Sequence, residues 1–236
     1  MSNSFVTAAK KVLKTEADAL VKLQDDLPID FSDLVKLILK LTGRVIVSGV
    51  GKSGHIGSKI AATLASTGTP AYFVHATEAS HGDLGMITAQ DLCLLISNSG
   101  ETIEMFDILT HSRRFGIPVD TMSSNCESTL VKTADFKLCL PMAEEACPIG
   151  MAPTTSTTMM LALGDALAVA LMEAKSFNAE NFKVFHPGGK LGAKLMTVGQ
   201  LMHKNDTMPL VKTETSMKET LLTMSSKGFG IAAIVD

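Results

Sequence analysis

The feature that most constrains the fold is the hydroxyl-rich turn at residues 97–104, with the sequence SNSGETIE. An apolar run at residues 91–96 precedes the turn and is typical of a buried strand. The apolar spacing at residues 103–109 indicates that a helix follows it. The turn therefore joins the carboxyl end of a strand to the start of a helix, where unpaired N–H groups and the helix dipole favour an anion.

The side chains of this turn suit an anion as well. Ser97, Ser99 and Thr102 can donate hydroxyl hydrogen bonds, and Gly100 allows the backbone to come close to a ligand. We interpret the turn as a phosphate cradle. The same residues also suit helix capping and a tight turn, and this stretch by itself does not decide between the two interpretations.

A second strand, glycine-rich turn and helix begin at the β-branched run of residues 44–50, which leads into GKSGHIG at residues 51–57. Its glycine spacing matches the fingerprint of dinucleotide-binding folds. That fingerprint expects an acidic residue after the next strand, but the next strand, at residues 71–74, ends in His75. The spacing of a P-loop is not met either. We therefore predict that this turn binds a phosphate group, but not as part of a dinucleotide site or a P-loop.

Further predicted strands at residues 117–122 and 136–140 alternate with helices. Such alternation predicts an α/β fold, with a doubly wound sheet of five parallel strands. In such sheets, ligands bind outside the carboxyl ends of the strands. Those ends carry polar residues that meet at one edge of the sheet, at positions 51–53, 75–81, 97–104 and 144–145. This convergence favours the phosphate cradle over helix capping alone.

Composition excludes several classes of protein. Hydrophobic residues make up 46% of the chain and charged residues 19%, which supports a buried core and argues against disorder. A net charge of −3 gives no electrostatic case for a nucleic-acid partner. We identify no apolar run that would span a membrane and no signal peptide, so we expect a cytoplasmic protein. We expect the four cysteines to be buried free thiols rather than zinc ligands.

The remaining segments carry little chemistry. The predicted helices at residues 3–25 and 31–41 are amphipathic, and we expect them to pack on the sheet or on a partner subunit. A helix at residues 159–174 is rich in Ala and Gly, which is typical of close helix packing. Residues 198–236 have the pattern of a separate unit that stops on a predicted strand at residues 231–235. We expect the chain to be a fragment of a longer protein.

Eight motifs, in order along the chain, together resemble one family. They lie at residues 50–57, 61–70, 81–86, 97–102, 145–148, 152–154, 164–168 and 186–189. Over these motifs the chain resembles the sugar isomerase (SIS) fold, and more closely the arabinose-5-phosphate isomerases of the KpsF/GutQ type. Residues 198–236 resemble the first part of a CBS module. The resemblance implies a SIS domain with N-terminal helices at residues 1–195 and an incomplete CBS module at residues 196–236.

That family interconverts D-ribulose 5-phosphate and D-arabinose 5-phosphate, requires no cofactor, and supplies the inner-core sugar of lipopolysaccharide. The resemblance implies a homotetramer and a nucleotide-like ligand at the CBS module. It implies catalytic roles for Lys52, Glu104, Glu145 and His186. The expected substrate contacts are Ser53, Gly68, Thr69, His75 and His81, together with the cradle residues Ser97, Ser99 and Thr102. His75 is also the candidate ligand of an inhibitory zinc ion.

One stretch departs from the family pattern. Residues 120–125, with the sequence DTMSSN, replace the more apolar strand end and the Thr-Gly turn that the resemblance predicts. We expect this departure to affect the packing of the fourth strand more than the chemistry.

The implied reaction moves a proton between C1 and C2 through a cis-enediol. A carboxylate whose pKa is raised by burial could take the carbon proton, and the sequence does not choose between Glu104 and Glu145 for this role. Lys52 could offset phosphate or enediolate charge, and His186 could open the furanose or shuttle protons between the oxygens. Because His186 lies beyond the long helix, we expect it to reach the site of another chain.

Two alternatives remain open at this point. One is an isomerase of a longer sugar phosphate, such as a phosphoheptose. The other is a non-catalytic sugar-phosphate sensor. A DNA-binding regulator would need a helix-turn-helix, and residues 1–42 have neither the basic charge nor the turn for one.

Overall fold

The computed structural model describes residues 2–186 and 198–236. The chain divides into two compact units, Met1–His186 and Pro187–Asp236. A second unit near the C-terminus was predicted. The predicted boundary between residues 195 and 196 lies outside the described residues, as do residues 187–189 of the last motif.

The first unit is built on a five-stranded parallel sheet, as predicted. Its strand order is β2-β1-β3-β4-β5, and every neighbouring pair is parallel. The strands are β1 (Val45–Gly49), β2 (Ala71–Phe73), β3 (Leu92–Ile96), β4 (Val119–Ser123) and β5 (Phe136–Cys139). β1, β3 and β4 are buried along their whole length. In β3 this burial is visible in the sequence as a continuous apolar run, whereas β4 buries polar residues among apolar ones.

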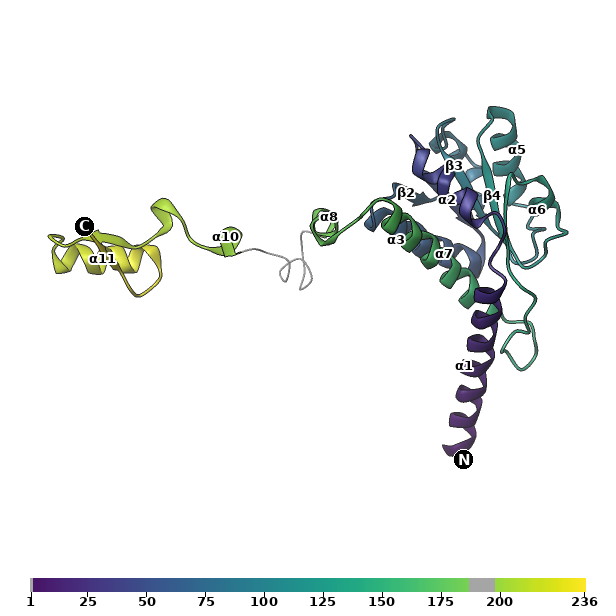
Figure 1. The fold of residues 1–236 in the computed structure, drawn as a ribbon, viewed down its shortest axis with the longest axis horizontal. Coiled ribbons are helices and arrows are strands. Elements are labelled where there is room, and N and C mark those ends of the chain that lie inside the picture. The colour runs from purple at the N-terminus through teal and green to yellow at the C-terminus, as the bar shows by residue number, and fades with distance from the viewer. Residues whose placement is uncertain (1, 187–197) are drawn as a thin grey trace. The chain divides into compact units, whose positions relative to one another are not determined.

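Helices cover both faces of the sheet (Figure 1). One face is covered by α1 (Ser2–Asp25), α2 (Phe31–Lys40), α3 (Gly51–Ser66) and α7 (Thr155–Ala174). The other face is covered by α4 (Ala76–Ala79), α5 (Met105–Phe115) and α6 (Thr129–Thr133). Each face has its own apolar cluster, so the sheet is wound on both sides, as the alternation of strands and helices predicted.

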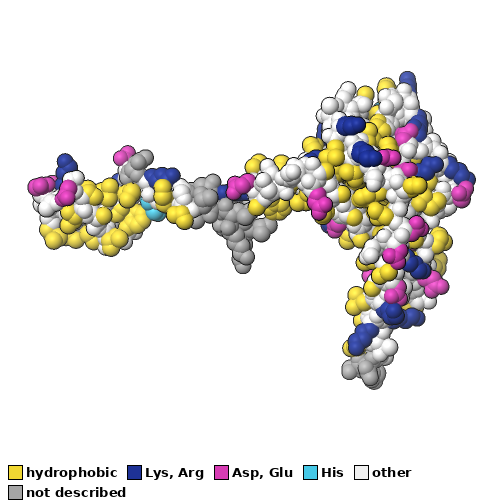
Figure 2. All heavy atoms as spheres, viewed as in Figure 1, with side chains coloured by type: hydrophobic (Ala, Val, Ile, Leu, Met, Phe, Trp, Pro, Cys, Tyr) yellow, Lys and Arg dark blue, Asp and Glu magenta, His cyan; other side chains and the backbone are white. Residues whose placement is uncertain are grey.

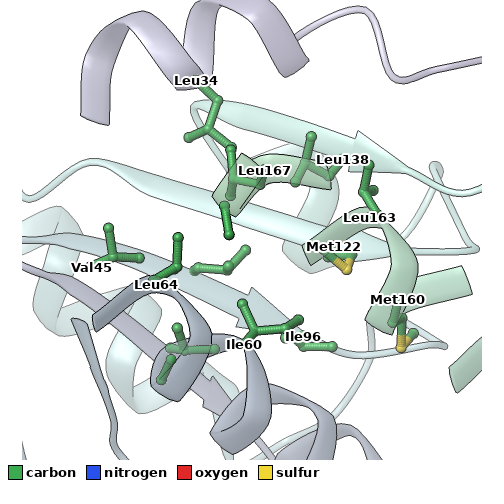
Figure 3. Close-up of a cluster of buried hydrophobic side chains, with 14 of the residues drawn as sticks. Leu34, Val45, Ile60, Leu64, Ile96, Met122, Leu138, Met160, Leu163 and Leu167 are labelled. Carbon is green, nitrogen blue, oxygen red and sulfur yellow. The ribbon is translucent and has the colours of Figure 1, made fainter. Parts of the chain in front are cut away.

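The larger cluster lies between the sheet and the pair α3 and α7 (Figure 3). Leu64 of α3 and Leu163 and Leu167 of α7 are almost fully buried there. The two helices approach closely because Gly164 has no side chain, and a Cβ at that position would fall 2.4 Å from Ile60. An ion pair between Lys59 and Asp165 joins the same helices. The small residues of α7 therefore serve close packing, as predicted.

α7 is also long and apolar enough to cross a membrane, by length and composition alone. The sequence analysis recognised no such run, and on these two criteria it was wrong. Half of the apolar window is buried inside the first unit, where α7 contacts α1, α2 and α3. These contacts account for its apolar character without a membrane.

α1 packs through its second half only. Ala19 and Leu23 are buried, and α1 contacts α7. In the first half, Phe5, Val6 and Leu13 are more than half exposed. Figure 1 shows the N-terminal part of α1 extending away from the sheet, and Figure 2 shows hydrophobic side chains on the surface of this helix. Packing on the first unit is thus confirmed for the second half, and a partner for the first half stays a prediction.

The second unit is small. It contains α10 (Val198–Leu201), a short 3-10 helix η2 (Asn205–Thr207), β6 (Leu210–Lys212), α11 (Met217–Lys227) and β7 (Ala233–Val235). β6 and β7 pair in parallel, and Ser216 and Glu219 form a capping box at the start of α11. Several short elements were not predicted from the sequence. They are β6 and η2 and, in the first unit, α4, η1 (Asp83–Met86) and α8 (Ala179–Phe185).

A carboxyl group lies in the core of the first unit. Asp120, on β4, is fully buried, and neither of its oxygens has a hydrogen-bond partner within the described residues. Burial raises the pKa of Asp120 well above its usual value, and the nearby negative charge of Asp30 raises it further. The N–H groups of Thr121 and Leu138 offset part of this effect. This carboxyl belongs to the stretch at residues 120–125 that departs from the family pattern, and β4 nevertheless pairs in regular parallel register with β3 and β5. An effect of the departure on packing stays a prediction.

This burial makes the stability of the first unit depend on pH. A folded-state pKa above the unfolded value means that stability falls as pH rises from the unfolded pKa, about 3.9, toward the folded one. Asp120→Asn removes the ionisable group. Relative to the wild type, its unfolding free energy should rise between pH 4 and pH 7, by at most about 1.4 kcal/mol for each pH unit.

Urea unfolding followed by Tyr72 fluorescence measures this gain, because Tyr72 is the single tyrosine, the chain lacks Trp, and Tyr72 lies in the first unit. The exposed Asp33→Asn is the control and should show no comparable gain. A difference between Asp120→Asn and wild type that does not change with pH would contradict a raised pKa of Asp120.

Candidate active site

The candidate site lies where the strand order reverses. From β1 the chain passes to β2 on one side, and β3 then pairs with the other side of β1. The connections therefore diverge at β1 and β3, and in open α/β sheets ligands bind outside the carboxyl ends of the strands at such a reversal. Gly49 and Ile96 are paired at the ends of these strands, so the turns that follow them lie side by side.

The first of these turns opens α3. Lys52 is exposed in the first turn of this helix, and Ser53 beside it is half-buried. The N-cap residue is Val50, which has no side-chain capping bond. The first N–H groups of a 16-residue helix are thus left for an anion, with an ammonium group beside them.

The second turn is the predicted cradle. Ser97 Oγ and Thr102 Oγ1 are hydrogen-bonded at 2.7 Å, Ser97 Oγ also accepts from Gly100 N–H, and Ser99 Oγ accepts from Glu101 N–H. These hydroxyls therefore shape the turn. Within the described chain, the N–H groups of Ser99 and Thr102 donate to no acceptor, and they remain as anion donors. The capping and cradle interpretations are therefore compatible. The side-chain hydroxyls stabilise the turn, and the backbone N–H groups remain as donors for an anion.

Gly100 has a structural role in this turn. Its φ is +66°, and a Cβ there would fall 1.9 Å from Ser128 Oγ. The absent side chain allows the turn to pack against the segment after β4, and the approach of its backbone to a ligand stays a prediction.

The predicted site residues Glu104, His75 and His81 lie at the same edge. Glu104 is exposed at the N-cap of α5 and makes no capping bond, so its carboxylate remains available. His75 is half-buried at the N-cap of α4, and its Nδ1 accepts from Thr77 N–H at 3.3 Å. His81 is exposed just after α4.

The residues around His75 do not by themselves fit a zinc ion. The described residues contain no group of three or more His, Cys, Asp or Glu that could hold a metal. The bond from Thr77 N–H occupies Nδ1 of His75, so only Nε2 is left for a metal. Zinc binding at His75 stays a prediction.

Glu145 is the most constrained carboxylate at this edge. Its Oε2 accepts from the N–H of Thr154 at 2.6 Å and from Thr154 Oγ1 at 3.0 Å, and its Oε1 accepts from Ser156 Oγ. Partial burial alone would raise the pKa of Glu145, but these bonds hold it below the usual range. A carboxylate with a pKa raised by burial was expected, and for Glu145 that expectation was wrong.

Sequence reasoning missed Thr154 and Ser156, which hold this carboxylate. The signal for them was present in the hydroxyl run at residues 154–158, directly before the apolar part of α7. Such a run at a helix start supplies hydroxyl and N–H donors together, and both kinds converge on Glu145.

Three predicted residues lie at the opposite edge of the same chain. Gly68 and Thr69 precede β2, and Lys175, at the end of α7, donates to both of them. His186 follows α8, where its ring stacks on Phe182 and its Nδ1 lies 2.9 Å from Phe182 O. α7 starts near Glu145 and spans about 30 Å over its 20 residues, so these groups do not meet the cradle of their own chain.

The cysteines are free, as predicted, but they differ in burial. Burial raises the pKa of Cys93 to about 11. Cys139 is half-buried, and burial together with the neighbouring Cys126 thiol raises its pKa to about 12. Cys126 is exposed and Cys147 half-buried, so the expectation of buried thiols is correct only for Cys93. Nearby backbone N–H groups lower the pKa of the Cys147 thiol.

The comparisons with known proteins agree with this geometry. A family model described as the SIS domain matches residues 38–170. Arabinose 5-phosphate isomerase KdsD of Yersinia pestis is 50% identical over 233 residues, which cover 98% of this chain and 71% of that protein. The enzyme of the same name from Pseudomonas aeruginosa is 48% identical and is covered to 72%. This chain belongs to the SIS-domain arabinose 5-phosphate isomerases.

A solved structure of an E. coli CFT073 protein in complex with arabinose 5-phosphate is similar to this arabinose 5-phosphate isomerase in fold. The TM-score is 0.77 at 40% sequence identity, and the match covers 79% of this chain and all of the other. The family and the SIS fold, both expected from the eight motifs, are thereby confirmed.

The hydrogen bonds on Glu145 lead to a stability prediction for this family member. Glu145→Gln should lower the unfolding free energy by about 1–2 kcal/mol at pH 7, because charge-assisted bonds at the start of α7 are lost. A depressed pKa means that this contribution is present above about pH 4.3 and is lost as pH falls through the folded pKa.

The matched control is Glu144→Gln, an exposed carboxylate one residue earlier, which should change stability by less than about 0.5 kcal/mol. Thermal or urea unfolding of both variants at pH 7 and pH 4 is the measurement. Equal losses for the two variants would show that the bonds on Glu145 contribute nothing specific.

Proposed function

We propose that this chain interconverts D-ribulose 5-phosphate and D-arabinose 5-phosphate through a cis-enediol. The observation that carries the proposal is the similarity to curated arabinose 5-phosphate isomerases over 98% of the chain. The similar fold of the E. coli CFT073 protein in its complex with arabinose 5-phosphate supports the same substrate. Neither comparison favours a longer sugar phosphate or a non-catalytic sensor.

The reversal point of the sheet offers two neighbouring helix starts for the phosphate. The beginning of α3 contributes N–H groups and the ammonium of Lys52, and the turn at residues 97–102 contributes the N–H groups of Ser99 and Thr102. Together they neutralise a dianion more fully than one helix start would. A phosphate fixed there holds the sugar at a constant distance from the carboxylates at the same edge.

The base at carbon is assigned to Glu104. Glu145 already accepts bonds at both oxygens, which stabilise its ionised form and make it a poorer proton acceptor. Glu104 is exposed at the start of α5, directly after the cradle, and makes no capping bond. Glu145 then stays ionised and fixes the loop between β5 and α7.

Glu104→Gln should therefore lower kcat roughly a hundredfold to ten-thousandfold, because a base at carbon is lost. The measurement is proton NMR of ribulose 5-phosphate in deuterium oxide, where conversion appears as arabinose 5-phosphate labelled at C2. Glu144→Gln is the control and should keep the parental rate.

A large loss in Glu145→Gln with near-parental kcat in Glu104→Gln would reverse the assignment. Near-parental kcat in both variants would rule out a glutamate base. No conversion by the wild type would contradict the proposed function.

The catalytic site is assigned to more than one chain. His186 lies beyond α8 at the far end of α7, and Gly68 and Thr69 lie at the same end. A pentose phosphate is much shorter than the roughly 30 Å of α7, so these groups can act with Lys52 only across two chains. We take the assembly to be a homotetramer, in which His186 of one chain opens or protonates the sugar bound to another.

Complementation tests this arrangement. Lys52→Ala and His186→Ala should each be inactive alone. Mixed after unfolding and refolding together, they should restore roughly a quarter of the sites, because random pairing recreates sites with both wild-type groups. The rate of the mixture measures this recovery. If the mixture stays as inactive as its components, or if a dilute monomer keeps full activity, the site is complete within one chain.

We further propose a pathway for the product, a ligand for residues 198–236 and a mode of inhibition. The product would supply the inner-core sugar of lipopolysaccharide in the cytoplasm. Residues 198–236 would form part of a CBS module that binds a nucleotide-like ligand. The reaction would need no cofactor, and zinc would inhibit through His75, with the other ligands supplied from outside the groups described in this chain.

A further inference from the structure

Residues 123–130, which follow β4, form a support under the cradle at residues 97–102. The two segments lie side by side because β3 and β4 are neighbouring strands, and Ser97 N–H donates to Met122 O at 3.1 Å. Regular strand pairing stops beyond this point. The contacts that continue past the strand ends involve side chains of residues 123–130 and carbonyl groups of the cradle.

Ser123 begins this support. Its Oγ donates to Asn98 O at 3.1 Å and accepts from Asn125 N–H at 3.1 Å. Ser123 is fully buried, whereas Asn98 is exposed. The buried Ser123 at the end of β4 thus holds the exposed cradle residue Asn98 in place.

Asn125 makes the next contact between the support and the cradle. Its Nδ2 donates to Ser99 O at 3.2 Å, and the next carbonyl, Gly100 O, accepts from Leu130 N–H at 3.2 Å. The contact between Gly100 and Ser128 leaves no room for a Cβ, so the segments are packed as well as hydrogen-bonded. Three consecutive cradle carbonyls therefore point toward residues 123–130.

Those carbonyls decide where the cradle donors point. In a trans peptide, C=O and N–H lie in one plane and point in opposite directions. Holding the carbonyls of residues 98–100 toward the support turns the N–H groups of residues 99–101 away from it. One of these, Ser99 N–H, has no acceptor within the described chain.

We propose that Ser123 and Asn125 are positioning residues that set the affinity of the cradle for the substrate phosphate by fixing the direction of its N–H donors. The inference rests on the proposed function for the identity of the substrate. Both side chains act through the cradle carbonyls to which they donate. Phosphate is bound alike in the ground state and the transition state, so loss of either contact raises KM and leaves kcat unchanged.

The test uses the full chain and three variants. Ser123→Ala and Asn125→Ala should each raise KM for ribulose 5-phosphate, and the inhibition constant of inorganic phosphate, roughly threefold to tenfold, as expected for one lost hydrogen bond. Ser124→Ala is the matched control. Ser124 Oγ donates at 2.8 Å to the side chain of Asn98, not to a cradle carbonyl, so both constants should stay at wild-type values.

A fall in kcat with unchanged KM, or equal changes in Ser124→Ala, would overturn the inference. If the buried Ser123→Ala does not fold, Asn125→Ala gives the answer alone, because Asn125 is exposed.

Direct binding of inorganic phosphate, measured by calorimetry, distinguishes a failure of the positioning roles from a failure of the proposed function. Should the wild type bind phosphate without isomerising, the proposed function fails, and weaker binding by the two variants still supports the positioning roles. An active wild type whose variants bind phosphate normally overturns only the positioning roles.

Discussion

The parallel pairing of β1 with β3 is the interaction on which the rest of the structure depends. It joins strands that are separated in the sequence by β2, and so it creates the single reversal of strand order in the five-stranded sheet. The start of α3 and the hydroxyl-rich turn become neighbours only through this pairing. Residues such as Lys52 and Ser97, far apart along the chain, are brought to one edge by backbone hydrogen bonds rather than by contacts of their own.

Hydrogen bonding, more than burial, decides the state of the carboxylates in this fold. Asp120 is buried without a donor, and its pKa is raised. Glu145 is partly buried among N–H and hydroxyl donors, and its pKa is lowered. The same desolvation therefore ends in pKa shifts of opposite direction, because hydrogen-bond donors stabilise the ionised form of Glu145 and not that of Asp120. Glu145 is therefore not a base activated by burial, and Glu104 is the remaining candidate of the two glutamates.

The length of α7 separates the groups of the first unit into two sets. The cradle, Glu104 and Glu145 lie at the carboxyl edge, and Gly68, Thr69 and His186 lie at the other end of the helix. A rigid helix of this length cannot bend to bring them together, because its small residues are packed against α3. The same packing that stabilises the core is therefore the reason why we propose that a second chain completes the site.

The sequence by itself determined the five strands of the first unit, the fold class and the family. Buried parallel strands such as β3 are continuous apolar runs, and glycine-rich or hydroxyl-rich turns mark their carboxyl ends, so local patterns suffice to find them. Short elements such as β6 and α8 were missed, because three to seven residues carry too little periodicity.

Only the tertiary structure decided what depends on neighbours distant in sequence. It showed that the missing side chain of Gly100 makes room for Ser128, that Thr154 and Ser156 lower the pKa of Glu145, and that His186 lies far from its own chain's cradle. The physical reason is that direction, desolvation and distance are set by packing between segments, and a local pattern contains none of these quantities.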